Sequence, residues 1–112
     1  MSIGERIKGA VAPIVPEVAA DTYTGDADTY CTWNATEIPT AYADNEPHAI
    51  HYLAQLHLFV PFRSNPTQLK RKLRRALLNA DFTAPTVETV DASEAEGRHI
   101  VFEFESVERE VF

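Results

Sequence analysis

The chain has 112 residues, of which 45% are hydrophobic and 24% are charged, and its formal net charge is −7 with a pI near 5.0. This length and composition predict one folded domain, residues 1–112, with one modest core. The acidic balance argues against a protein that binds nucleic acid or membranes with its whole surface. Cys31 is the only cysteine, so no internal disulfide can form and a reducing compartment is the simpler expectation. We see no apolar run near the ~18 residues of a membrane span and no signal-peptide core.

The N-terminal part of the chain predicts a helix over residues 2–12. Ser2 and Glu5 have the spacing of a capping box, in which each side chain satisfies a free backbone amide of the other. Apolar residues then recur on one side of the helix, and Pro13 ends it. A short helical turn is expected over residues 17–20.

The middle of the chain predicts two strands. Aromatic and β-branched residues dominate residues 30–38, and Pro39 is expected to end that strand. Residues 40–47 are polar and are interpreted as an exposed, mobile loop. Residues 49–60 are predicted to form a strand, whose successive side chains fall on opposite faces. The face predicted to meet the core carries Ile50, Tyr52, Ala54, Leu56, Leu58 and Val60.

The clearest helix is predicted over residues 65–80. Asn65 suits the N-cap and Pro66 suits the first helical position. One apolar stripe follows the helical period and consists of Leu69, Leu73, Ala76, Leu77 and Ala80. Of the ten Lys and Arg residues in the chain, five fill the rest of this helix, namely Lys70, Arg71, Lys72, Arg74 and Arg75.

The C-terminal part predicts a hairpin of two strands, residues 86–90 and 99–107, joined by an acidic turn that contains Gly97. The order of elements predicts an α+β fold with two layers: a mainly antiparallel four-stranded sheet with two amphipathic helices packed on one face. The other sheet face would carry Leu53, Phe59 and Val101 among polar residues. This mixture is too apolar for solvent alone and favours contact with a neighbouring subunit.

The residue patterns argue against an enzyme, a metal centre or a cofactor site. His51 and His57 share a strand face, but they lie about 20 Å apart at the rise of a strand, which is too far for one metal ion. Asp26 and Asp28 begin an acidic stretch that lacks the glycine of a calcium loop. Cys31 has no nucleophile signature around it and is interpreted as a small buried residue.

The basic helix has three interpretations: contact with nucleic-acid phosphates, contact with an acidic protein surface, or a solvated face. Leu78 falls at the centre of the basic side, which is typical of an apolar anchor with a charged rim. The last strand supplies acidic residues of opposite charge. The candidate interface residues are therefore Arg71, Arg74, Arg75, Leu78, Glu103 and Glu105.

Several short stretches in a fixed order carry a resemblance to a known family. An aromatic strand, YCTWN at residues 30–34, precedes a long strand with QLHLFV at residues 55–60. That strand runs into an Asn-capped helix that ends in ALLNADF at residues 76–82, and a hairpin ends in HIVFEF at residues 99–104. From about residue 3 to residue 107 the chain resembles the small tail-terminator (tail-completion) proteins of long-tailed bacteriophages and prophages. Relatives often have a glycine where this chain has Asp81.

The resemblance implies a structural protein of the virion that needs no cofactor and touches no membrane. Members of that family form a homo-oligomeric, typically hexameric, ring that caps the finished tail tube and ends its growth. The ring meets the tail tube protein on one side and the head-tail connector protein on the other, and DNA passes through its lumen without specific recognition. The expected locations are the head-tail junction of the virion and, during assembly, the host cytoplasm. The alternatives are another small head-tail joining protein, or a stand-alone nucleic-acid-binding module that uses the basic helix.

Overall fold

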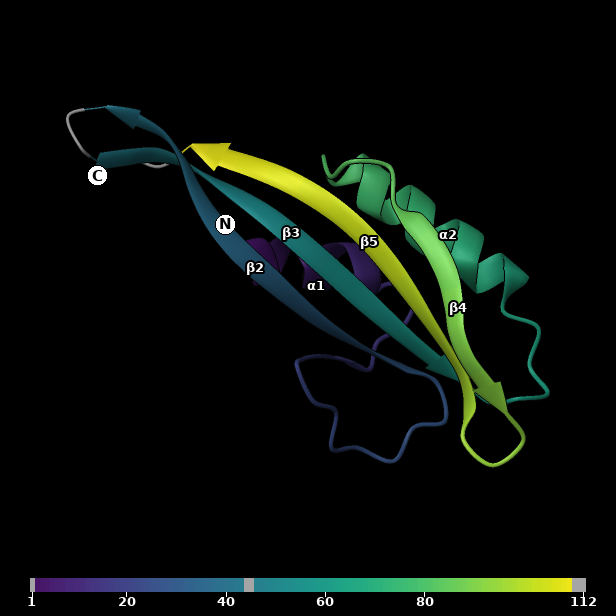
Figure 1. The fold of residues 1–112 in the computed structure, drawn as a ribbon. Helices are drawn as coiled ribbons and strands as arrows, with labels where there is room; N and C mark the ends of the chain where they lie inside the picture. Colours follow the sequence, from purple (N-terminus) through teal and green to yellow (C-terminus); the bar gives the residue numbers. More distant parts are fainter. Residues whose placement is uncertain (1, 44–45, 110–112) are drawn as a thin grey trace.

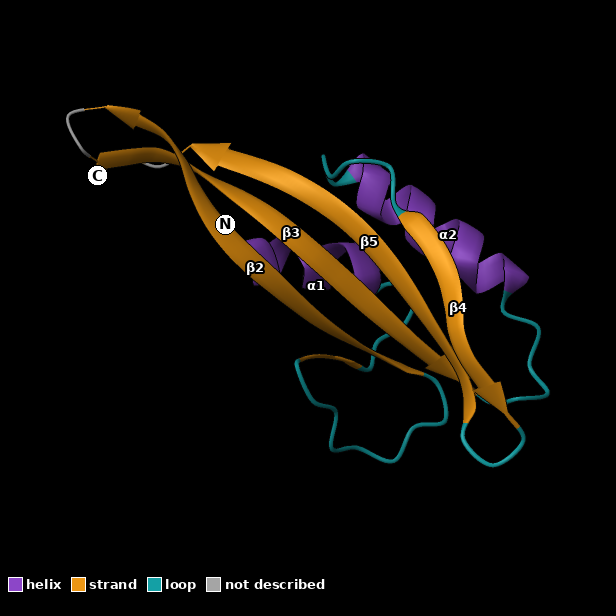
Figure 2. Ribbon diagram, viewed as in Figure 1, coloured by secondary structure: helices purple, strands orange, loops and turns teal. Residues whose placement is uncertain are grey.

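The computed structural model of the protein describes residues 2–43 and 46–109. These residues form two helices and five strands in an α+β fold, so the predicted class is confirmed (Figures 1 and 2). In chain order the elements are α1 (Ile3–Val11), β1 (Val18–Ala20), β2 (Tyr30–Ala43), β3 (Glu46–Val60), α2 (Thr67–Asn79), β4 (Thr86–Ser93) and β5 (Gly97–Arg109). The strands lie side by side in the order β1-β2-β3-β5-β4.

Strand β1 makes the prediction of a four-stranded antiparallel sheet wrong. Residues 17–20 were expected to form a helical turn, but Val18–Ala20 pairs in parallel with Cys31–Trp33 of β2. The sheet is therefore mixed, with antiparallel pairing in its other neighbours. A strand of three residues is too short to show any periodicity, so only its pairing with β2 could reveal it.

Strands β2 and β3 form one long hairpin whose far end reaches beyond the rest of the sheet (Figure 1). Their pairing continues to Ala43 and Glu46, whereas the recorded pairing of β5 with β3, which ends at the last described residue, reaches Ala49. The predicted loop is therefore wrong for residues 40–43 and 46–47, and residues 44–45 lie outside the described part. The prediction rested on the polar residue types of this stretch, whereas its strand structure comes from backbone pairing between β2 and β3.

Pro39 does not end β2, because the strand continues past it with Pro39 opposite Ile50. Strand β1 covers β2 only as far as Trp33. In the described residues β2 is an edge strand beyond that point, and proline is tolerated on an edge because its missing N–H can face away from the ladder.

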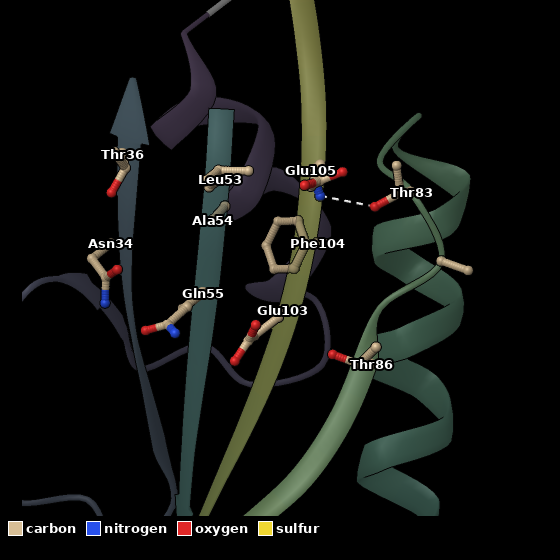
Figure 3. A pocket seen from close by; sticks show the side chains of 11 residues that line it. Asn34, Thr36, Leu53, Ala54, Gln55, Thr83, Thr86, Glu103, Phe104 and Glu105 are labelled. Carbon is tan, nitrogen blue, oxygen red and sulfur yellow. Dashed lines mark hydrogen bonds between the residues drawn. The ribbon is translucent and has the colours of Figure 1, made fainter. Parts of the chain in front are cut away.

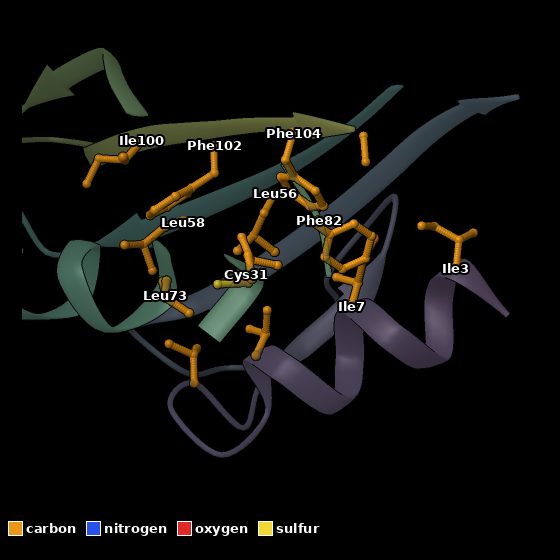
Figure 4. Packing of buried hydrophobic residues seen from close by; sticks show 14 of the residues in the cluster. Ile3, Ile7, Cys31, Leu56, Leu58, Leu73, Phe82, Ile100, Phe102 and Phe104 are labelled. Atoms are coloured by element: carbon orange, nitrogen blue, oxygen red, sulfur yellow. The ribbon is translucent and has the colours of Figure 1, made fainter. Parts of the chain in front are cut away.

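Both helices pack their apolar sides on the same face of the sheet and close one core with it (Figure 4). The alternating residues predicted for the core face of β3 are all buried, as are Leu73 and Leu77 of α2 and Phe102 and Phe104 of β5. Leu69 is only partly buried at the margin. The outward side of each helix and the opposite face of the sheet are thereby left for other contacts.

Ser2 caps α1 as predicted, whereas the N-cap position of α2 is Pro66 and not Asn65. The backbone N–H of Glu5 donates to Ser2 Oγ over 3.1 Å, as in a capping box. Helix α2 begins at Thr67, slightly later than predicted, and the Thr67 N–H donates to Asn65 Oδ1 over 3.1 Å. These short-range contacts fix where each helix starts and therefore which side chains face outward.

Candidate functional site

The outward side of α2 carries the first candidate surface, which we call the basic face: Arg71, Arg74, Arg75 and Leu78. Leu73 and Leu77 point into the core, so the opposite side of the helix faces away from the sheet. All four residues of the basic face are exposed, and Leu78 keeps 50% of its surface accessible. With Asn79 and Ala84 they line a shallow hollow of about 360 Å³.

The charges of the basic face have no internal partner in the described residues, where neither recorded ion pair includes Arg71, Arg74 or Arg75. Three guanidinium groups therefore crowd around one exposed leucine without a carboxylate to balance them. An apolar centre with a charged rim is the usual anatomy of a protein-binding patch.

The open face of the sheet, opposite the helices, carries the second candidate surface. Glu103 and Glu105 are exposed there on β5, beside Leu53 and Gln55 of β3. These residues line a groove of about 630 Å³, which we call the acidic groove (Figure 3). Its remaining lining comes from Asn34, Thr36, Ala54, Thr83, Ala84, Thr86 and Phe104.

One rim of the acidic groove is held in place by Thr83. The Glu105 N–H donates to Thr83 Oγ1 over 2.8 Å, and the Thr83 N–H donates to the Glu105 carbonyl over 3.0 Å (Figure 3). Both bonds use the backbone of Glu105, so its carboxylate stays free to point outward. The recorded contact of that carboxylate is with His51, whose Nε2 lies 3.7 Å from Glu105 Oε1.

The two surfaces lie on opposite layers of the fold. The basic face looks outward from the helix layer, and the acidic groove opens on the side of the sheet that no helix covers. Ala84 borders both hollows, because the segment after α2 carries the chain from the helix layer round the edge of the sheet. The predicted interface residues thus form two separate sets, and neither recorded ion pair of the described residues joins one set to the other.

The apolar part of the open face differs from the sequence prediction. Leu53 is 39% exposed, as expected, but Val101 is buried and Phe59 is half-buried. The other exposed aliphatic residues of this face are Ile38 and Val107, which flank His51 in one row across three strands. Sequence alone missed this row because it depends on the register between strands.

A histidine pair lies at the other end of the open face and was also missed. His57 Nδ1 lies 2.8 Å from His99 Nε2, and Asn34 Nδ2 lies 3.0 Å from His57 Nε2. The amide of Asn34 can only donate through this nitrogen, so His57 Nε2 accepts and His57 Nδ1 donates to His99. Burial lowers the pKa of both rings; the charge of His99 lowers the pKa of His57 further, whereas Asp91 raises that of His99.

The same rings belong to a stack of aromatic side chains. Tyr23 stacks on Tyr30 at 4.3 Å between ring centroids, and Tyr30 stacks on Phe59 at 4.8 Å. Phe59 in turn stacks on His99 at 4.4 Å. These contacts hold the histidines in place, and we therefore interpret the pair as a structural part of the open sheet face.

Cys31 is fully buried, and burial raises the pKa of its thiol to about 12, so the reactive thiolate does not form near neutral pH. Within residues 2–43 and 46–109 no three His, Cys, Asp or Glu side chains gather closely enough to hold a metal ion. The helices in these ranges are also too short or too polar to cross a membrane. Comparison of the chain with protein-family models and with curated proteins finds no match.

Proposed function

We propose that this chain is a structural protein of a long-tailed bacteriophage or prophage that caps the tail tube as a ring, ends tail growth and forms part of the head-tail junction. The observation that carries the proposal is the pair of oppositely charged surfaces on opposite layers of one small fold. Each has an exposed leucine beside its charges, Leu78 on the basic face and Leu53 in the acidic groove. The resemblance of the short stretches described above supplies the family.

A ring is the assembly that such a pair of surfaces serves. A head-to-tail contact joins two different patches of neighbouring copies, and it closes into a ring when the rotation between copies permits. Six copies are proposed from the resemblance. The tail tube protein and the head-tail connector protein are the proposed partners on the two sides of the ring. The net charge of −7 suits a lumen through which DNA passes without binding.

The test is self-association of the purified chain, measured by sedimentation velocity. The wild type is expected to form a species of ring mass, and Arg71→Glu with Arg75→Glu is expected to stay monomeric with an unchanged melting temperature, because exposed charges contribute little to stability. The matched control is Arg63→Glu with Lys72→Glu, which changes the net charge equally at exposed residues outside the hollow. Equal association of the wild type and the Arg71/Arg75 variant would contradict the proposal.

The second candidate function is nucleic-acid binding, which the five basic residues of α2 favour. Leu78 argues against it, because an apolar side chain at the centre of the basic face gains nothing from phosphates. A gel-shift titration at two salt concentrations separates the two functions. The assembly proposal expects no DNA binding near physiological salt. Clear binding that weakens steeply with salt and is lost in the Arg71/Arg75 variant would favour the nucleic-acid module.

The remaining alternative is another small head-tail joining protein of the same phages. It shares the need for protein-binding surfaces, so the contact between copies does not separate it from a terminator. An assay of tail-tube elongation separates the two functions. A terminator stops the elongation of tail tubes, whereas a protein that joins at a later step leaves elongation unchanged.

A further inference from the structure

The acidic groove has the chemistry to receive a basic, leucine-bearing protein surface. Its acidic side is formed by Glu103 and Glu105, which are exposed and have free carboxylates except for the distant contact to His51. Its apolar side is formed by Leu53. The amide of Gln55 lies next to Glu103 on the neighbouring strand, and Asn34 lies beyond Gln55 on β2 (Figure 3). A carboxylate beside an amide accepts and orients guanidinium groups, because Arg donates through a planar fork.

The basic face of α2 is the complement of that groove. It presents three arginines around one leucine, and the groove presents two glutamates around one leucine. Bringing them together pairs opposite charges and removes two exposed leucine side chains from water at the same time. The arginines are available for contacts with another copy, because within the described residues none of them forms an ion pair inside its own chain.

We propose that the basic face of one copy docks into the acidic groove of the next copy, with Leu78 against Leu53 and with Arg71, Arg74 and Arg75 toward Glu103 and Glu105. This inference deepens the proposed function, since it rests on self-assembly of the chain and names the surface that receives the basic helix. The two surfaces are different patches on different elements, so their pairing between copies is a head-to-tail contact, and each added copy exposes a fresh groove or a fresh basic face.

Disulfide trapping tests the position of the contact. In a chain with Leu53→Cys and Leu78→Cys, mild oxidation is expected to give a ladder of covalent multimers, because each copy offers one thiol to each neighbour. Native Cys31 is fully buried and does not compete. The matched control is Leu78→Cys with Val90→Cys, since Val90 is about as exposed as Leu78 but lies on β4 outside the groove. A ladder that is no stronger than in this control would overturn the docking.

Charge exchange between copies tests whether the basic face of one copy pairs with the acidic groove of the next. One variant carries Arg74→Glu with Arg75→Glu, and the other carries Glu103→Arg with Glu105→Arg. Alone, each presents like charges across the contact and should lose association. Mixed, the two variants pair opposite charges at both kinds of junction, so association should return. If the wild type associates and the mixture does not, the docking is wrong while the ring proposal stands; if the wild type does not associate even on tail tubes, the proposed function itself fails.

Discussion

His57 Nδ1 and His99 Nε2 lie 2.8 Å apart on neighbouring strands β3 and β5. Folding lowers the pKa of both rings below the ordinary value of 6.5 through burial. Between that value and the lower folded values, the unfolded chain binds more protons than the folded one. Stability therefore falls as the pH drops below 6.5 and stops falling once the folded rings are also protonated.

Urea unfolding at about pH 7.5 and about pH 5 measures this effect. The wild type is expected to lose stability at the lower pH, and His57→Gln with His99→Gln is expected to lose less. His51→Gln is the control, because it removes a histidine of the same face that is not part of the pair. An unchanged pH dependence in the double variant would show that the pair does not control acid stability.

The stripe of α2 is predicted to hold the helix to the sheet. Leu73 is fully buried, so Leu73→Ala should lower the free energy of unfolding by about 2–5 kcal/mol, as cavities in cores do. Leu78→Ala is the matched control: that leucine is half-exposed, and its loss should change stability by less than about 0.5 kcal/mol. Equal effects of the two substitutions in chemical denaturation would refute the assignment of the two sides of α2.

Arg6 is predicted to tie α1 to the far end of α2 and to β5. It donates to Ser106 Oγ over 2.9 Å and to the Ala80 carbonyl over 3.0 Å, pairs with Glu108, and lies over the ring of Phe82. Arg6→Gln should cost about 1–3 kcal/mol, because it leaves polar partners unpaired in a half-buried place. Arg6→Lys should recover only part of this loss, since a single ammonium cannot reproduce the fork. Thermal melting checks the expected order of stability, in which the wild type is the most stable, Arg6→Lys is intermediate and Arg6→Gln is the least stable.

Gly97 is predicted to be required at the β4–β5 turn. Its φ is +85°, and a Cβ at this position would lie 2.5 Å from the carbonyl oxygen of Val60. Gly97→Ala should therefore destabilise the protein by about 1–3 kcal/mol. Gly9→Ala is the control, since a Cβ there meets nothing within 4 Å and alanine favours the helix. Stability of Gly97→Ala at or above the wild type would show that the turn relaxes freely.

Much of the fold could be predicted because its main elements are long enough to show a period. Helix α2 and strand β3 repeat their pattern many times, so their buried sides followed from spacing alone. Strand β1 has three residues and no period, and the sequence of the outer part of the β2–β3 hairpin is polar and has the composition of a loop. Both depend on pairing with a distant segment, which spacing within one segment does not reveal.

The candidate site also has one part that could be predicted from the sequence and one part that could not. The basic face lies on one helix, so a helical wheel was enough to place Leu78 among the arginines. The acidic groove joins residues of four strands and of the segment after α2, and Leu53 meets Glu105 only through the register of β3 and β5. The same register brings His57 to His99. Features within one element were therefore predictable, and features between elements were not.

Electron micrographs of tail tubes would show the proposed ring itself. Tail tube protein of a long-tailed phage or prophage, the partner in the proposed function, is allowed to elongate with and without the chain, and the tube ends are imaged. The account predicts a ring of this protein on one end of each tube and an end to elongation there, whereas the Arg71→Glu/Arg75→Glu variant leaves the ends bare. Tubes that keep growing, with bare ends in the presence of the wild-type chain, would contradict it.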